Sequence, residues 1–291
     1  MNLSEIHSRI KNSLQQGRYR RFIQQSAYRQ TLSKLPPELC KHWQTHAKQE
    51  FTGIPTDIIF FIQAAEGLMM FFDCASQADR ACGLPSKAAD SVWHAWLTLP
   101  QKYFTAQDVD SFCRQYFGKA IPHVAAEQME DSISGALAVS LLQLRRMAKE
   151  DPLSDYVPAL FTLDRRLKMP RGYSYRSDGQ RLGFQHMSLL GLGSGAMVYP
   201  DYFLPDQLLA FGLINASTLA QFHASQERRA QYANAQQGSS CSSVSSSDLF
   251  ANSASCDSAG SSSSDSSCSD SSSGDSGSSC GSSCGSSCSS S

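Results

Sequence analysis

The chain has 291 residues, with 25 basic and 26 acidic side chains and a formal net charge of −1 at pH 7. This balance excludes the dense positive surface expected of a dedicated nucleic-acid-binding protein. Four of its ten cysteines lie in residues 1–237 and form no C-x-x-C pair, which argues against a zinc ribbon and against a dense disulfide framework.

Apolar residues at helical spacing predict the helices of the N-terminal part. A first helix is expected from about residue 3. A second begins after Pro36-Pro37 and runs toward residue 51, because proline suits the first turn of a helix. A third is expected over 57–74. This segment is apolar almost all round, so it is predicted to lie at the centre of the domain.

Two amphipathic helices carry the clearest signals. Ser86 is the expected N-cap of a helix whose apolar stripe consists of Ala89, Val92, Trp93, Trp96 and Leu97. The spacing of Thr105 and Asp108 predicts a capping box at the start of the next helix. Gly118 suits the position that follows its last turn.

Farther along the chain, we expect a long helix over 126–149 and a short one over 157–167. Residues 170–202 are rich in Gly, Tyr and Ser, and we interpret them as irregular with a hairpin around 177–179. The helical pattern returns over 205–234. The expected fold class is therefore all-α, a compact multi-helix domain with one irregular Gly/Tyr-rich segment.

The composition changes abruptly after residue 237. Of residues 239–291, 30 are serine, and from residue 238 onward there is no Lys, Arg, His, Trp or Tyr. Such a segment cannot bury enough apolar surface to offset the entropy of ordering it. We predict one helical domain over 1–237 and a disordered tail over 238–291. Three roles stay open for the tail: a passive extension, a binder of soft metals, or the substrate of a modifying enzyme that acts on Cys280, Cys284 and Cys288.

The location and the partners are also predicted from composition. The N-terminus lacks an unbroken apolar region, so no secretory signal is expected. The most apolar run, 58–72, contains Gln63 and Glu66 and is too short to span a bilayer. Residues 1–237 hold 25 basic and 21 acidic residues, too small an excess for a specific nucleic-acid partner. We expect a cytoplasmic protein with reduced thiols, no transmembrane segment and a protein as its partner.

One segment resembles a known family. Its residues are Pro85-Ser86, Asp90, Trp93-His94, Tyr103, Phe112-Cys113, Gly118 and His123. In this order they resemble the glycine-rich domain-containing-protein-like (GRDP-like) family, over about residues 20–175. Trp96 stands where the family pattern Trp-His-x-His has its second histidine, and Ala89 replaces the usual valine. The resemblance implies a family domain followed by a tail rich in Gly and Cys, and it brings no established enzymatic activity to carry over to this chain.

Within this segment, Asp90 and His94 are four residues apart on one predicted helix, so their side chains are neighbours. A carboxylate beside an imidazole fixes the tautomer of the ring and raises its basicity, as in general bases and around metal ligands. His123 can close the cluster, because one helix and one loop return it toward His94. Three interpretations stay open: a buried network between helices 86–98 and 106–117, a metal site, and acid–base catalysis.

Other motifs are interpreted as structural. His42 and His46 have Trp between them where a zincin motif has Glu. Residues 191–195 lack the spacing of a dinucleotide-binding loop. Cys113 lies on a buried stripe, which denies it the access a nucleophile needs. The basic residues Arg18, Arg20 and Arg21 are interpreted as a solvated helix face, in preference to a site for nucleic acid or anionic lipid.

The leading functional hypothesis is a helical interaction or scaffold domain with a modifiable tail. Whether the protein is an enzyme is left uncertain, its cofactors are unknown, and no catalytic, cofactor-binding or metal-binding residue is assigned. The alternative is a metal-dependent enzyme centred on Asp90, His94 and His123. A structural network would be sealed by neighbouring aromatic side chains, whereas an enzyme site would lie in an open pocket. The residues to test are Asp90, Trp93, His94, Tyr103, Cys113 and His123.

Overall fold

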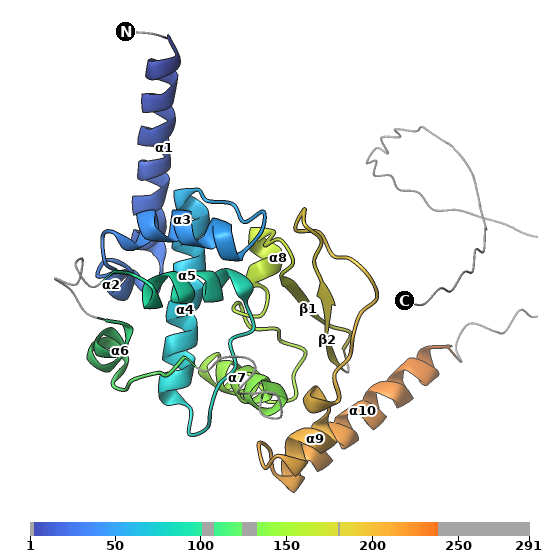
Figure 1. Cartoon of the computed structure of the whole chain (residues 1–291). Coiled ribbons are helices and arrows are strands. Elements are labelled where there is room, and N and C mark those ends of the chain that lie inside the picture. The colour runs from blue at the N-terminus through green and yellow to red at the C-terminus, as the bar shows by residue number, and fades with distance from the viewer. Residues whose placement is uncertain (1–2, 101–107, 124–132, 180, 238–291) are drawn as a thin grey trace, which may run out of the picture. The chain divides into compact units, whose positions relative to one another are not determined.

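The structure, a computed structural model, describes residues 3–100, 108–123, 133–179 and 181–237 (Figure 1). Several features expected from the sequence lie outside these ranges, namely Tyr103, the capping-box residue Thr105, and the tail with Cys280, Cys284 and Cys288.

The described part is mostly helical, as predicted, and adds a small sheet to the expected all-α architecture. The helices before the sheet are α1 (Leu3–Gln25), α2 (Arg29–Leu32), α3 (Leu39–Glu50), α4 (Ile58–Gln77), α5 (Lys87–Leu97), α6 (Val109–Phe117), α7 (Ile133–Met147) and α8 (Leu163–Leu167). After them come β1 (Tyr173–Ser177), β2 (Leu182–His186), a 3₁₀ turn η3 (Asp201–Phe203), α9 (Pro205–Ala210) and α10 (Ala216–Gln237).

Helix α4 forms the centre of the domain, as its uniform apolarity predicts (Figure 1). The Asp57 carboxylate caps it by accepting hydrogen bonds from the amides of Ile59 and Phe60, both 3.0 Å long. By length and hydropathy α4 is also the one described helix that could cross a membrane. Most of it is buried against neighbouring elements, as befits a core helix, and the largest of its fully buried side chains are Phe61, Phe72, Ile62, Leu68 and Met69.

Capping residues close to each end in the sequence define where α5 begins and where α6 begins and ends. The Ser86 hydroxyl accepts a hydrogen bond of 3.2 Å from the Ala89 amide, which confirms Ser86 as the N-cap of α5. Helix α6 is capped by Asp108, whose carboxylate accepts from the Ser111 amide at 2.6 Å. The role expected for Asp108, inside a helix capped by Thr105, was therefore wrong. Gly118 ends α6 in the left-handed conformation, as predicted.

The second part of the core lies under the sheet. Strands β1 and β2 pair antiparallel with Tyr173 opposite His186, which confirms the predicted hairpin. The predicted helix over 157–167 is limited to α8, and turns precede it. The helical region expected over 205–234 is divided into α9 and α10 by a turn in which Gly212 takes a positive φ. The buried residues here include Leu137, Leu141, Phe161, Tyr175, Phe203 and Leu208.

The environment of α5 differs from the expected one. Helix α5 packs mainly against α3 and α4, and it reaches α6 through Trp96, whose ring lies 4.8 Å from that of Phe112. A buried hydrogen bond of 3.0 Å from the Trp43 indole to the Ser91 hydroxyl joins α3 to α5. His94 is hydrogen-bonded to Glu50 of α3, so it does not lie at a seam between α5 and α6, where His94 and His123 were expected.

Candidate metal centre

The start of α5 is fixed by a buried carboxylate on α8. Asp164 is 1 % exposed and accepts hydrogen bonds from the Ser86 hydroxyl and from the amides of Lys87 and Ala88, at 2.7, 3.1 and 2.9 Å. A fourth, from the Tyr173 amide, is 3.0 Å long. Burial raises the pKa of Asp164, and these four donors oppose that rise by stabilising the charged form. Residues 86–88 are therefore anchored, and with them the helix that carries Asp90 and His94.

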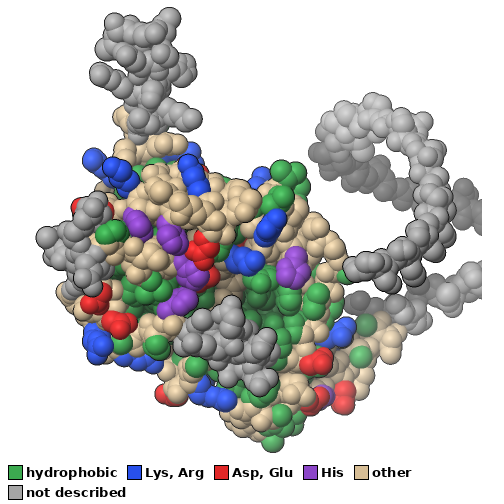
Figure 2. All heavy atoms as spheres, viewed as in Figure 1, with side chains coloured by type: hydrophobic (Ala, Val, Ile, Leu, Met, Phe, Trp, Pro, Cys, Tyr) green, Lys and Arg blue, Asp and Glu red, His purple; other side chains and the backbone are tan. Residues whose placement is uncertain are grey.

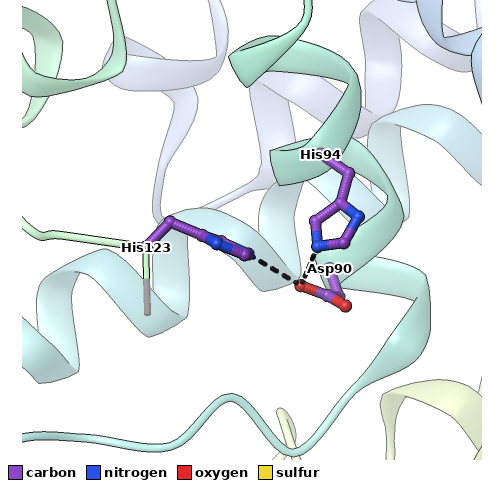
Figure 3. Close-up of side chains that lie close together, drawn as sticks. All are labelled: Asp90, His94 and His123. Atoms are coloured by element: carbon purple, nitrogen blue, oxygen red, sulfur yellow. Dashed lines mark ion pairs between the residues drawn. The ribbon is translucent and has the colours of Figure 1, made fainter. Parts of the chain in front are cut away.

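Asp90, His94 and His123 converge on one point (Figure 3). Asp90 Oδ1 lies 3.5 Å from His94 Nε2, one turn later on α5, as the spacing predicts. It also lies 3.7 Å from Nε2 of His123, which comes from the segment after α6. The three candidate ligand atoms all lie within 4.8 Å of one another. The expectation that His123 closes the cluster is confirmed.

The three side chains fit a metal ion in donor type and access, and two of their three separations fit it in length. Two imidazole nitrogens and a carboxylate oxygen are ligands of Zn²⁺ and of non-haem Fe²⁺. Ligands 2.0–2.1 Å from a tetrahedral ion lie about 3.4 Å from each other, close to the two separations from Asp90 Oδ1. The side chains of Asp90, His94 and His123 are 32 %, 28 % and 23 % exposed, so an ion and a further small ligand can reach them.

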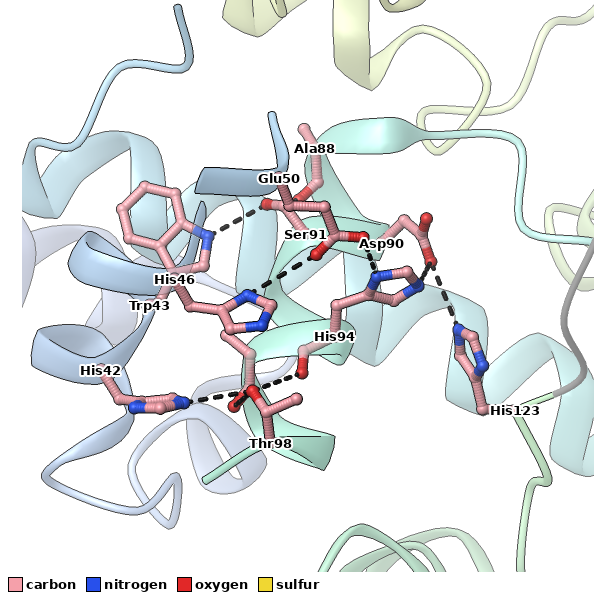
Figure 4. A network of polar contacts seen from close by, with 11 residues as sticks. His42, Trp43, His46, Glu50, Ala88, Asp90, Ser91, His94, Thr98 and His123 are labelled. Carbon is pink, nitrogen blue, oxygen red and sulfur yellow. Dashed lines mark hydrogen bonds and ion pairs between the residues drawn. The ribbon is translucent and has the colours of Figure 1, made fainter. Parts of the chain in front are cut away.

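A second layer of polar contacts orients His94 (Figure 4). Its Nδ1 is hydrogen-bonded to Glu50 at the end of α3, which leaves Nε2 directed at Asp90. The other oxygen of Glu50 lies 3.6 Å from His46 Nδ1. A carboxylate on the far nitrogen of a ligand histidine fixes its tautomer and increases its basicity. Sequence reasoning missed Glu50, although His42, His46 and Glu50 follow one another at the i, i+4 spacing of one helix face.

His42 joins the same row at its outer end. Its Nε2 lies 3.1 Å from the Thr98 hydroxyl, and that hydroxyl donates to the His94 carbonyl oxygen at 3.0 Å. Partial burial and the neighbouring His46 lower the pKa of His42. The pair His42 and His46, interpreted as a solvated or packing feature, thus lies beside the candidate ligands.

Aromatic side chains support His123. Its ring meets that of Trp93 edge to face at 4.6 Å and that of His94 at 4.8 Å. Trp93 is 4 % exposed and packs its other side on Phe72 at 5.2 Å. The position of His123 is thereby tied to the core.

The cluster lies on the wall of a cavity of about 770 Å³. Figure 2 shows the histidines in a row on this face beside apolar surface. Trp96 and Phe112 are buried in the core, but Asp90, His94 and His123 line the cavity. The sealed environment expected of a purely structural network is therefore not what surrounds these three side chains. The remaining lining comes mostly from residues 78–87, 119–122 and four aromatic residues, Tyr173, Tyr175, Phe184 and Tyr202.

The other candidates lie apart from this cluster. Cys113 is fully buried, and burial raises its pKa to about 12, in line with the packing role that we predicted. The arginines 18, 20 and 21 are exposed on α1. Residues 191–195 form an irregular loop in which Gly191 and Gly195 take positive φ values.

The lining of the cavity also includes Cys82 and Lys87. Sequence reasoning missed both residues because neither has a motif around it.

Comparison with known proteins places the site in a family. A search of curated proteins and a search of solved structures found no match. A protein-family model, that of the UCP032817-like family, matches residues 21–191. This match covers more than half of the chain and includes Glu50, Asp90, His94, His123 and Asp164. The assignment to the GRDP-like family, made on a few spaced residues, was wrong, since nothing in the comparisons indicates that family. The chain belongs to the uncharacterised UCP032817-like family.

Proposed function

We propose that this protein is a metal-dependent enzyme in which Asp90, His94 and His123 bind one divalent transition-metal ion. The observation that carries the proposal is the convergence of two Nε2 atoms and one carboxylate oxygen, within 4.8 Å of one another, on a cavity wall. The same cavity is large enough for a small-molecule substrate. This geometry favours the enzyme hypothesis over the interaction scaffold.

Three protein ligands leave coordination positions open for water or substrate, as in catalytic sites of the two-histidine, one-carboxylate type. Bound there, such an ion supplies Lewis-acid activation of a substrate or of water. The residues of the chain contribute orientation. Glu50 fixes the ring of His94, Trp93 supports that of His123, and Asp164 anchors the helix of Asp90.

The proposal is tested by metal content. Full-length protein is stripped with a chelator, incubated with Zn²⁺, Mn²⁺ or anaerobic Fe²⁺, freed of excess metal and analysed by mass spectrometry of the elements. We expect about one ion per chain for at least one metal. Asp90→Asn, His94→Gln and His123→Gln should each lose it. His223→Gln, which changes an exposed histidine on α10, should retain it.

The tail cysteines are a second possible source of bound metal. The measurement is therefore repeated on the full chain with all six tail cysteines replaced by serine, and the same stoichiometry is expected; these are Cys241, Cys256, Cys268, Cys280, Cys284 and Cys288. Retention of the ion in Asp90→Asn, His94→Gln and His123→Gln alike, or no retention by the wild type with any of the three metals, would contradict the proposal.

A further inference from the structure

We propose that the cavity binds organic anions with an apolar or aromatic body, and that the Lys87 ammonium group binds the anionic end. The inference names a substrate class and so rests on the proposed function for its catalytic meaning. Binding of the anion itself needs no metal, which allows the two proposals to fail separately.

The position of Lys87 on α5 supports this role. Lys87, Asp90 and His94 follow one another at i, i+3 and i+7, so all three lie on one face of the helix. At 1.5 Å per residue, Lys87 precedes Asp90 by about 4.5 Å and His94 by about 10.5 Å along the axis. All three line the cavity. An anion held at Lys87 would thus place the rest of a small molecule beside the candidate metal ligands.

Lys87 is also the cation best placed to take a ligand. Arg80 and Lys119 line the cavity too, but they donate to the carbonyl oxygens of Phe211 and Ala78. Lys87 Nζ lies 5.2 Å from the centre of the Tyr173 ring, and it forms no ion pair with any of the described residues. A cation over a ring keeps its outer side available to an anion.

The backbone amides at the start of α5 are already hydrogen-bonded, so they cannot bind an anion in place of the Lys87 side chain. The amides of Lys87 and Ala88 donate to Asp164, and that of Ala89 donates to Ser86. An anion here would therefore be recognised by the ammonium group of Lys87, and its affinity should depend on that group.

The other walls suit an apolar or aromatic body. They include Leu84, Ile121 and Leu137, together with the rings of Trp93 and Phe184. Burial raises the pKa values of Tyr173, Tyr175 and Tyr202, so these phenols stay neutral and do not repel an anion. The acidic groups of the lining are Asp79 and Asp90, against Arg80, Lys87 and Lys119. Binding of a divalent ion at Asp90 would make the net charge of the cavity lining more positive still.

Two fluorescent dyes that share one aromatic body test the inference. The anionic probe is 8-anilinonaphthalene-1-sulfonate, and the neutral probe is N-phenyl-1-naphthylamine. Both are titrated into the full-length protein with a chelator present. Lys87→Met should weaken binding of the anionic dye about tenfold and leave that of the neutral dye within about twofold. Lys41→Met, an exposed lysine on α3, is the matched control and should change neither.

Lys87→Arg keeps the charge and should keep the affinity for the anionic dye; circular dichroism verifies that each variant is folded. Equal affinity of wild type and Lys87→Met for the anionic dye would overturn the inference, as would an equal loss for both dyes. Asp90→Asn should bind the anionic dye at least as tightly as the wild type. If the wild type binds no metal but its affinity for the anionic dye still depends on Lys87, the proposed metal-dependent enzyme is rejected and the anion site is retained.

Discussion

The Asp164 carboxylate accepts a hydrogen bond of 2.7 Å from the Ser86 hydroxyl, 78 residues earlier in the chain. This contact adds a cap from α8 to the local N-cap of α5. Gly172 permits it, because a Cβ at that position would lie 2.7 Å from Asp164 Oδ2. The orientation of the candidate metal ligands therefore depends on a carboxylate that does not itself line the cavity.

Replacing Asp164 by Asn should destabilise the protein. Each carboxylate oxygen accepts two hydrogen bonds, and an amide group would turn its NH₂ toward two of the donors and leave them unpaired in the core. We expect a loss of about 3 kcal/mol in the free energy of unfolding, measured by urea denaturation. Asp155→Asn, at a half-exposed aspartate, should change it by less than about 0.5 kcal/mol. Equal effects of the two substitutions would refute the role given to Asp164.

Replacing Glu50 by Gln should weaken metal binding without removing a ligand. Glu50 is hydrogen-bonded to the far nitrogen of His94, and the Gln amide would orient the ring less firmly as a metal ligand than the carboxylate does. We expect metal affinity to fall about 10- to 100-fold, measured by competition with a chromogenic chelator. Glu227→Gln, on the exposed face of α10, should have no effect. An unchanged affinity in Glu50→Gln would show that this contact does not tune the site.

Metal should stabilise the wild type and fail to stabilise His94→Ala. A ligand that binds only the folded state raises the unfolding temperature, by an amount that grows with the ratio of its free concentration to its Kd. For the wild type, the unfolding temperature should be higher with added metal than with chelator. For His94→Ala, the two temperatures should be equal. With chelator present, His94→Ala should lie within about 1 kcal/mol of the wild type, because its partners Asp90 and Glu50 are exposed enough to bond water. A large loss that is independent of metal would support the structural network.

Among the described cysteines, Cys82 should be alkylated fastest by iodoacetamide near neutral pH. Its hydrogen bond with Cys74 and the nearby Lys119 lower its pKa, and it lines the cavity. Burial raises the pKa of Cys40 to about 11 and that of Cys113 to about 12. Since the thiolate is the nucleophile, a cysteine with a lowered pKa should be alkylated faster than one with a raised pKa. Peptide mapping by mass spectrometry measures them, and in urea the four rates should converge. Native labelling of Cys113 ahead of Cys82 would contradict this order.

Two helical glycines should respond to alanine in opposite directions. At Gly67 of α4, a Cβ would lie 2.2 Å from Leu163 Cδ2, so Gly67→Ala should cost about 1–3 kcal/mol by displacing the buried Leu163 side chain. At Gly17 of α1 nothing lies within 4 Å, and Gly17→Ala should stabilise the protein by about 0.5–1 kcal/mol through helix propensity. Calorimetric melts compare the two variants. Stabilisation by Gly67→Ala would show that the Leu163 side chain makes room for a methyl group without cost.

The sequence by itself predicted the elements whose signals are local. Ser86 and Gly118 mark a helix start and a helix end through the backbone groups they satisfy, and both predictions were right. The apolarity of α4 predicted its central position, and the i, i+4 spacing brought Asp90 beside His94. The resemblance based on the same segment was wrong, because a few residue types at fixed spacings recur in unrelated families.

The tertiary structure decided which of these residues form a site. Glu50 meets His94 across 44 residues, and Asp164 caps α5 across 78, and no periodicity in the sequence records such pairs. The expected contact between the helices over 86–98 and 106–117 exists through Trp96 and Phe112, but α5 packs more extensively on α3 and α4. Both α5 and α6 have an apolar stripe, and a stripe does not specify which partner covers it. Whether Asp90, His94 and His123 face a sealed core or a cavity depends on the volume that α4, the sheet and residues 78–87 leave unfilled. That volume is a property of packing in three dimensions, so only the folded structure determines it.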